Sequence, residues 1–230
     1  MELKEYYASL DPKELWLPSF PHWTQFRFSL DANLISMRKI KDVINTRADL
    51  LFYLRKYAPY HVFYMTSKFL DATVVNKKGN KLSQNLFLFS DEIVLDIDRD
   101  TIEESKQAAY DLVKYLKKVN MLPYMVVFSG KKGFHLHLPF GCRSGSDSPA
   151  EREQDTLLCK KAIIENIEED TGIKIDSVAG WNTRGIIRLP GTIHGKTGNL
   201  VEKIGIEDIK GYEPKRIVDV KKEIKFKEFV

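Results

Sequence analysis

The spacing of apolar residues near the start of the chain predicts short helices. Prolines divide residues 1–60 into pieces, and Met37, Ile40, Val43 and Ile44 recur at helical spacing. We therefore expect residues 1–60 to form an N-terminal helical layer.

The middle of the chain alternates between strand and helix patterns. Three short apolar runs have strand composition, at residues 61–65, 85–90 and 93–97. The polar segment Asn76–Asn80 between them predicts a turn. Thr101 and Glu104 have capping-box spacing and precede apolar positions on one helical face, which predicts a helix of about 18 residues.

A strand, a tight turn and a second strand follow this helix. After Pro123, the apolar runs 124–128 and 134–138 flank the turn Ser129–Gly133. A second long helix is expected over about residues 150–171, with Gly172 where a C-cap belongs. The last predicted strand covers residues 185–189.

This alternation favours an α/β sandwich with a mixed sheet and flanking helices, because no repeat or low-complexity linker interrupts it. We expect one domain over residues 1–230. Its parts are the helical layer 1–60, a catalytic core 61–212 and a C-terminal tail 213–230.

Composition narrows the class of protein. The chain has 230 residues and 43% hydrophobic content, enough to bury a core. Thirty-six basic residues oppose 32 acidic ones, and the resulting charge of +4 does not by itself indicate nucleic acid. No uncharged stretch approaches the length of a membrane span, no signal peptide is apparent, and two cysteines make no disulfide framework. We expect a cytoplasmic protein without a membrane partner.

Two carboxylates mark the end of the predicted strand 93–97. Asp96 and Asp98 stand at i and i+2, so both project from one face while Leu95 and Ile97 point into the core. Like charges roughly 6 to 7 Å apart on a sheet repel unless a cation lies between them, and oxygen ligands suit Mg²⁺ or Mn²⁺. A solvated strand end is the alternative.

The turn Ser129–Gly133 has the composition of a phosphate site. It combines a hydroxyl, two glycines, Lys131 and Lys132, so that backbone N–H groups and ammonium charges can surround an anion. An ordinary hairpin turn with solvated lysines is an equal alternative. His135 and His137 follow on one face of the next strand, but no nearby cysteine completes a zinc set.

Cations and acids are segregated along the chain. Residues 126–146 and 177–200 contain no acid, and the second stretch carries Arg184, Arg188, His194 and Lys196. Asp176 immediately precedes that stretch, either as a third ligand or as a turn cap. This division predicts a bipolar cleft in which carboxylates hold metal and cations hold polyphosphate, as phosphoryl or nucleotidyl transfer requires.

Three segments, taken in order, resemble the catalytic motifs of the archaeo-eukaryotic primase superfamily: IVLDIDRD, VFSGKKGFHLHLPF and IDSVAGWNTRGIIRLPGTIHGKTG. The similarity is to the small, catalytic subunit of archaeal DNA primases and covers about residues 60–200. It implies a two-layer primase core with an RRM-like sheet.

The resemblance also implies roles for the site residues. Asp96, Asp98 and Asp176 match the acids that are catalytic and bind the divalent metals. The positions that match contacts to the incoming nucleotide are Ser129, Lys131, Lys132, His135, Arg188 and His194. The implied activity is that of a DNA-directed primase or polymerase, a nucleotidyltransferase that makes or extends primers on single-stranded DNA from NTPs or dNTPs.

Two departures from the family pattern bear on whether the chain can bind a template and start primers without another subunit. Residues 99–128 contain no Cys or His, so the family's zinc knuckle is missing there, and the short span from His135 to Asp176 leaves no room for an inserted helical subdomain. We therefore expect weak template binding by the chain alone and a requirement for a primase large subunit or another accessory subunit.

Two other functions fit part of the pattern. A non-catalytic accessory or nucleic-acid-binding subunit could keep the primase fold, although the three acids are all present. A metal phosphoesterase would use the same acids but would not need the cations that clamp a triphosphate.

Overall fold

The computed structural model describes residues 1–74, 86–142, 144–176 and 180–220. The predicted turn at 76–80, the first residue of the run 85–90, Arg143 and the last ten residues of the tail lie outside the described residues. The helices are α1 (Leu3–Ser9), η1 (Pro12–Glu14), η2 (Pro21–Trp23), α2 (Arg47–Tyr57), α3 (Ile102–Lys118) and α4 (Pro149–Thr171). The strands are β1 (Phe26–Ser29), β2 (Arg38–Lys39), β3 (His61–Met65), β4 (Ser67–Phe69), β5 (Phe87–Ser90), β6 (Glu92–Ile97), β7 (Met125–Phe128), β8 (Phe134–Pro139), β9 (Ile186–Arg188) and β10 (Glu202–Ile204).

Strands β6, β7, β8 and β10 form one sheet in the order β10-β7-β8-β6. The predicted α/β fold with an RRM-like sheet and flanking helices is confirmed, but the sheet is not mixed. Every described strand pair is antiparallel. The unit β6-α3-β7 does connect two parallel strands, as its pattern predicted, but β8 lies between them and pairs antiparallel with both.

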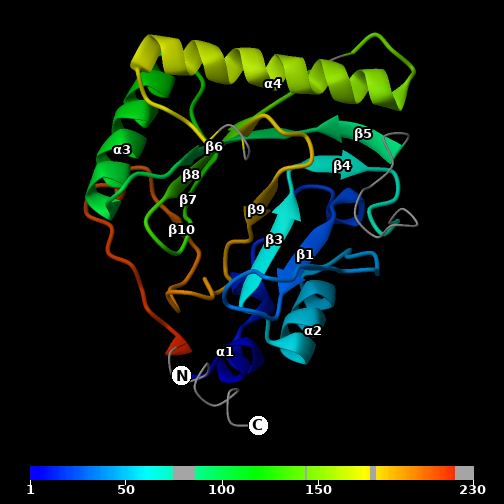
Figure 1. Cartoon of the computed structure of the whole chain (residues 1–230), viewed down its shortest axis with the longest axis vertical. Coiled ribbons are helices and arrows are strands. Elements are labelled where there is room, and N and C mark those ends of the chain that lie inside the picture. Colours follow the sequence, from blue (N-terminus) through cyan, green and yellow to red (C-terminus); the bar gives the residue numbers. More distant parts are fainter. Residues whose placement is uncertain (75–85, 143, 177–179, 221–230) are drawn as a thin grey trace.

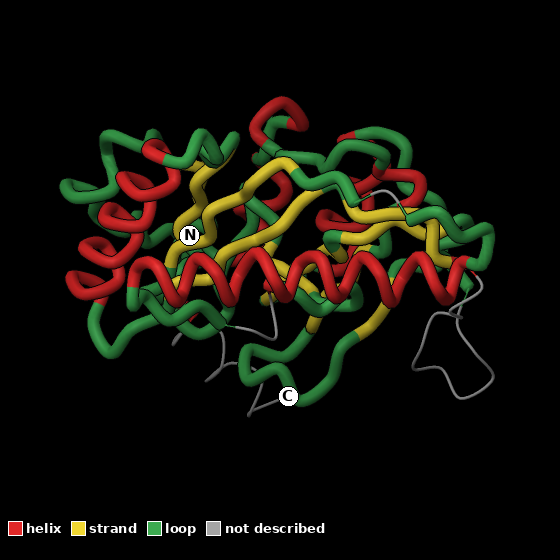
Figure 2. Tube along the Cα trace, turned by 90° about the horizontal axis from the view of Figure 1, so that it is seen from above, coloured by secondary structure: helices red, strands yellow, loops and turns green. Residues whose placement is uncertain are grey.

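Helices α3 and α4 cover this sheet. The capping box predicted at Thr101 is present, because the Thr101 hydroxyl accepts from the N–H of Glu104 and the Glu104 carboxylate accepts from the N–H of Thr101. Leu112 and Leu116 of α3 pack with Leu95 of β6 in one buried cluster. Helix α4 also contributes to this cluster, and it crosses the top of the molecule and spans much of its width (Figures 1 and 2). Gly172 ends α4 with a left-handed φ of 69°, as predicted.

The N-terminal part differs from the predicted helical layer. Helices α1 and α2 are present, but β1 and β2 lie between them and join β3 and β9 in a second sheet of order β2-β1-β3-β9. The helical spacing of Met37, Ile40, Val43 and Ile44 is misleading, because residues 38–39 form a strand and residues 40–46 carry no helix. Since β2 is only two residues long, its strand period does not stand out in the sequence.

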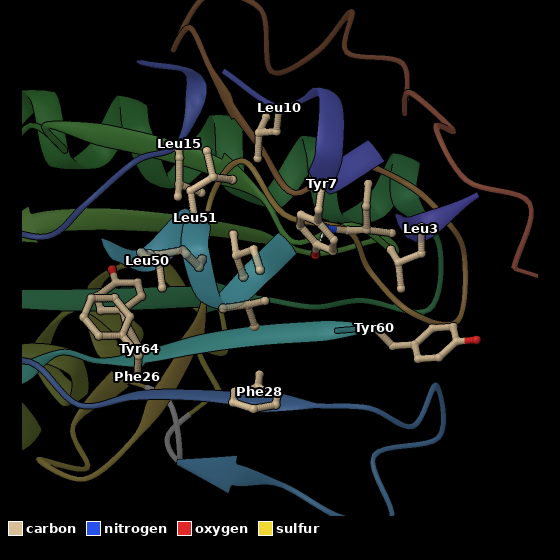
Figure 3. Packing of buried hydrophobic residues seen from close by; sticks show 14 of the residues in the cluster. Leu3, Tyr7, Leu10, Leu15, Phe26, Phe28, Leu50, Leu51, Tyr60 and Tyr64 are labelled. Carbon is tan, nitrogen blue, oxygen red and sulfur yellow. Dashed lines mark hydrogen bonds between the residues drawn. The ribbon is translucent and has the colours of Figure 1, made fainter. Parts of the chain in front are cut away.

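A second buried cluster holds this sheet against α1 and α2. Figure 3 shows side chains of α1, α2, β1 and β3 meeting there, Tyr7 and Leu50 among them. The fully buried Tyr7 hydroxyl donates to the Pro59 carbonyl at 3.1 Å and accepts from the Ile193 N–H at 3.4 Å. Val94 of β6 belongs to the same cluster, so the two sheets share a core. The predicted division of the chain into three parts stays a prediction.

No helix in the described parts of the chain is long and apolar enough to cross a bilayer. The cytoplasmic location stays a prediction.

Candidate active site

Asp96 and Asp98 lie where β6 ends, and the strand's alternation directs them away from the helices. Leu95 and Ile97 are fully buried against α3 and α4, as predicted, so Asp96 projects from the opposite face. The Asp98 side chain is about half exposed, at 53%, and that of Asp96 is 20% exposed. The two carboxylates are therefore partly exposed at the end of β6, while the apolar residues next to them are buried in the core.

Strand β8 places the basic turn beside these carboxylates. Asp96 pairs directly with His135, and the His135 Nε2 lies 3.7 Å from the Asp96 Oδ1. The ammonium of Lys132 is 3.4 Å from the Asp98 Oδ1. Ser129 closes the turn by donating its backbone N–H to the carbonyl of Gly133 at 2.9 Å.

The third predicted acid joins the pair. The backbone N–H of Asp176 donates to the carbonyl of Asp96 at 2.9 Å, which brings a loop 80 positions further along the chain to the end of β6. Burial raises the pKa of Asp96, and the charges of Asp176 and Asp98 raise it further, to about 7, against the opposing effect of Arg188. Three mutually repelling carboxylates are the donor chemistry that a divalent cation suits.

The described residues do not form a closed metal cage. Among residues 1–74, 86–142, 144–176 and 180–220, no three His, Cys, Asp or Glu side chains are grouped closely enough to hold an ion by themselves. The oxygens of Asp96, Asp98 and Asp176 would have to supply part of the shell, with the remaining positions left to water and substrate, which is usual for Mg²⁺. The predicted Mg²⁺ or Mn²⁺ stays a prediction.

Arg188 comes from the other sheet. It lies on β9, and its guanidinium donates to the Nδ1 of His61 at 2.7 Å. The Nε2 of His61 lies 2.9 Å from the carbonyl of Ala32, so this nitrogen carries the proton and Nδ1 accepts. Burial lowers the pKa of Arg188 to about 10, which leaves it charged at neutral pH beside Asp96.

His194 packs against the same histidine and against the basic turn. Its ring centre is 5.3 Å from that of His61. Gly130 has a φ of 93°, and a Cβ there would come within 2.5 Å of the His194 Cβ, so this close approach requires glycine. Thr197 and Asn199 both donate side-chain hydrogen bonds to the Gly130 carbonyl. These contacts hold the turn Ser129–Gly133 against the segment that carries His194.

His61, His135 and His194 are neutral at pH 7. Burial is the main cause in each case, and it lowers the pKa of His61 to about 4 and the pKa values of His135 and His194 to about 3. Their contribution is hydrogen bonding rather than charge. The Nδ1 of His135 is buried and has no hydrogen-bond partner among the described residues.

Lys131 and the basic stretch 177–200 complete the cationic side. Lys131 is exposed, and its charge contributes to lowering the pKa of His194. Arg184, by contrast, turns away from the site, because it pairs with Glu153 of α4 at 2.8 Å. Residues 177–179 at the start of the basic stretch lie outside the described residues.

Sequence reasoning missed His61 and Glu92. His61 begins an apolar strand, and a polar residue at that place was the available signal. Glu92 precedes the predicted strand 93–97, but in the structure it opens β6 and is buried. It accepts from the Tyr124 hydroxyl at 2.6 Å, and its Oε2 lies 2.9 Å from the His137 Nδ1. Burial alone would raise the pKa of Glu92, but His137, Lys68 and Tyr124 lower it to about 2.

Comparison with known sequences supports the resemblance on which these assignments rest. No protein-family model matches the chain. The chain is similar to proteins named DNA primase small subunit PriS. The protein from Pyrobaculum calidifontis is 22% identical over an alignment of 198 residues that covers 66% of this chain and 62% of that protein. That of Pyrobaculum aerophilum is 22% identical over 78% of this chain and 72% of its own length, and that of Thermoplasma acidophilum is 33% identical over 70 residues, 30% of this chain and 21% of its own length.

The chain resembles archaeal DNA primase small subunits. It spans less than two thirds of the length of the P. calidifontis primase subunit. Two solved structures share its fold. The polymerase domain of Mycobacterium tuberculosis ligase D, solved in complex with DNA, covers 99% of this chain with a TM-score of 0.57 at 11% identity, and the match spans 88% of that domain. The primase-polymerase domain of cyanophage S-2L covers 94% with a TM-score of 0.50 at 13% identity, and the match spans 97% of that domain. The fold is therefore that of primase-polymerase domains.

Proposed function

We propose that this chain is a metal-dependent, template-directed nucleotidyltransferase that makes or extends primers on single-stranded DNA. One observation carries the proposal: the carboxylates at the end of β6 and at Asp176 face the cations of two other motifs across one site. Nucleotidyl transfer requires this division, because negative charge is carried by the oxygens of the transferred phosphate and by the leaving pyrophosphate.

The carboxylates of Asp96, Asp98 and Asp176 would hold Mg²⁺ or Mn²⁺. The raised pKa of Asp96 is consistent with this role: burial raises it most, the charges of Asp176 and Asp98 raise it further, and a bound cation would relieve that repulsion. When bound, such a metal neutralises charge on the attacking and leaving oxygens.

The opposite side would bind the triphosphate. Lys131, Lys132 and Arg188 supply fixed positive charge, and the neutral imidazoles of His135 and His194 supply hydrogen bonds. The N–H groups of the tight turn after Ser129 add donors for a phosphate. Arg188 is itself oriented by His61, so that its guanidinium is fixed before substrate binds.

The experiment is incorporation of labelled NTP or dNTP by the purified chain on primed and unprimed single-stranded DNA with Mn²⁺ or Mg²⁺. We expect Asp96→Asn and Asp98→Asn each to lose at least about a thousandfold in rate, since a metal supplies several kcal/mol and about 1.4 kcal/mol is a factor of ten. Circular dichroism would confirm that both variants fold.

Activity of both variants at the wild-type rate would refute the metal assignment. An inactive wild-type chain that nevertheless binds DNA would favour the accessory subunit. The proposal includes a need for a primase large subunit. If the chain alone extends primers but does not start them, adding the large subunit should allow it to start them.

A further inference from the structure

A basic groove lies outside the site described above. It has a volume of about 900 Å³ and runs along β2, the loop that follows it and α2. Five cations and a single acid line it: Arg27, Arg38, Lys39, Lys41, Lys56 and Asp42. Such an excess of positive charge in a concave surface attracts a polyanion.

Aromatic rings stand beside these cations. Tyr57 stacks on Phe28 with ring centres 5.1 Å apart, and Tyr53 stacks on Tyr57 at 6.2 Å with an interplanar angle of 18°. The Lys56 ammonium lies 5.2 Å from the centre of the Tyr57 ring. Tyr53 and Tyr57 are half-buried, so part of each ring remains open to the groove. Aromatic platforms next to cations are typical of proteins that bind single strands, because the bases of a duplex are not free to stack.

A row of side chains connects the groove to the candidate active site. In the sheet β2-β1-β3-β9, Lys39 lies opposite Arg27, Arg27 opposite Phe63, and Phe63 opposite Arg188. Directly opposed residues of antiparallel strands share a face, so these four side chains form one line across the sheet. The guanidinium of Arg188 lies 4.9 Å from the centre of the Phe63 ring, and Arg188 is the cation that opposes Asp96.

The first two members of the row repel each other. Arg27 donates only to the neutral side chain of Gln25, at 2.9 Å, and the buried Lys39 Nζ has no partner among the described residues. Burial lowers the pKa of both groups, and Arg27 lowers that of Lys39 further. Like charges directly opposite each other destabilise a sheet, and a bound anion would remove this penalty.

We propose that the groove and the row bind the single-stranded DNA template and lead it to the catalytic carboxylates, an assignment that rests on the proposed function. Phosphates contact the cations of the groove and of the row, and bases stack on Tyr53 and Tyr57. The sequence analysis expected weak template binding by the chain alone. The groove supplies five cations beyond those assigned to the nucleotide.

The test is fluorescence anisotropy of a labelled oligothymidine with the full chain at several salt concentrations. The variant Arg38→Gln/Lys41→Gln/Lys56→Gln removes three exposed charges and no core contact. We expect at least tenfold weaker binding and a salt slope smaller by roughly 2, since each lost phosphate contact on a single strand contributes about 0.7. Lys39→Gln should weaken binding in the same direction.

A matched control removes three cations elsewhere. Lys114→Gln/Lys118→Gln/Lys210→Gln changes exposed lysines on and beside α3, two of which lie over Tyr110. It should bind within about twofold of wild type, because its lost charges are remote from the strand. Equal weakening by both triple variants, or no weakening by the groove variant, would overturn the proposal. Binding of a duplex of equal length as tightly as the single strand would overturn it as well.

Different results would refute template binding by the groove and nucleotidyl transfer by the chain. A wild-type chain that incorporates nucleotides, together with a groove variant that binds DNA normally, refutes the groove and retains the function. A groove variant that loses DNA binding in a chain that incorporates no nucleotide retains the groove and refutes the function.

Discussion

Both sheets contribute residues to the candidate active site, and they differ in how far apart along the chain those residues lie. The sheet β10-β7-β8-β6 provides Asp96, and β8 pairs His135 directly with it. The sheet β2-β1-β3-β9 provides Arg188 from β9 and His61 from β3, residues 127 positions apart that meet in one hydrogen bond. In the first sheet β6, β7 and β8 come from neighbouring segments, and β10 joins them from later in the chain. In the second sheet the site residues themselves depend on the long-range pairing of β3 with β9.

The acidic and basic sides of the site also differ in how their charged groups are stabilised. Burial, and after it the charges of Asp176 and Asp98, raise the pKa of Asp96, whereas Arg188 is held by an imidazole that burial keeps neutral. The carboxylates of the acidic side therefore repel one another, and a bound cation would reduce this repulsion. The basic side is preorganised by hydrogen bonds.

The largest effect that would test this comparison is expected at Arg188. We predict that Arg188→Ala weakens nucleoside triphosphate binding by about ten- to a hundredfold, because a charge-assisted hydrogen bond to phosphate is worth roughly 1.5 to 3 kcal/mol. Isothermal titration calorimetry with a non-hydrolysable nucleotide would measure it. Arg188→Lys keeps the charge but not the fork of donors and should recover part of the loss. Unchanged nucleotide affinity together with lost DNA binding would assign Arg188 to the template instead.

A smaller effect concerns the pH dependence of stability on the acidic side. The pKa of Asp96 is raised from 3.8 to about 7 in the folded protein, so between about pH 4 and pH 7 the native chain retains a proton that the unfolded chain has lost. This group's contribution to stability is fully present below pH 4 and is lost as the pH rises through 7. In metal-free buffer, Asp96→Asn should thus gain on the order of 4 kcal/mol over wild type between pH 4 and pH 8, because each unit of pKa shift corresponds to about 1.4 kcal/mol.

Urea unfolding of both proteins at pH 4, 6 and 8 measures this gain. Asp111→Asn, which changes an exposed aspartate on α3, is the matched control and should show no such trend. A difference between Asp96→Asn and wild type that does not vary with pH would contradict the picture of repelling carboxylates.

The sequence pattern predicts the first sheet well because its signals are local. The capping box at Thr101, the turn around Gly130 and the C-cap at Gly172 each encode a boundary within a few residues, and α3 and α4 begin and end within about two residues of the predicted limits. Asp96 and Asp98 were found from strand alternation alone. The position of Asp176 beside them came from the family resemblance, because the hydrogen bond that brings it there is long-range.

Half of the second sheet was missed for a physical reason: β3 and β9 were predicted as strands, but β1 and β2 were not. Strand β2 has only two residues, too few to show a period of two, and its stability comes from its pairing with β1. The three-residue strand β10 of the first sheet was missed for the same reason. The spacing of Met37 and Ile40 matched a helix by chance. The cation row from Lys39 to Arg188 was invisible for the same reason, since each neighbour in it belongs to a different strand.

The central claim is that the acids Asp96, Asp98 and Asp176 form a single site with the cations of the β7–β8 turn and of β9, and that this site binds a nucleotide and a divalent cation. The most direct test is the affinity of a non-hydrolysable nucleoside triphosphate with and without Mn²⁺ in wild type and Asp96→Asn. We predict that Mn²⁺ tightens nucleotide binding about tenfold or more in wild type, within the usual 5- to 150-fold range of coupled ligands, and that Asp96→Asn abolishes this coupling. The same Mn²⁺ effect in both proteins would contradict the claim, because the metal would then bind away from Asp96.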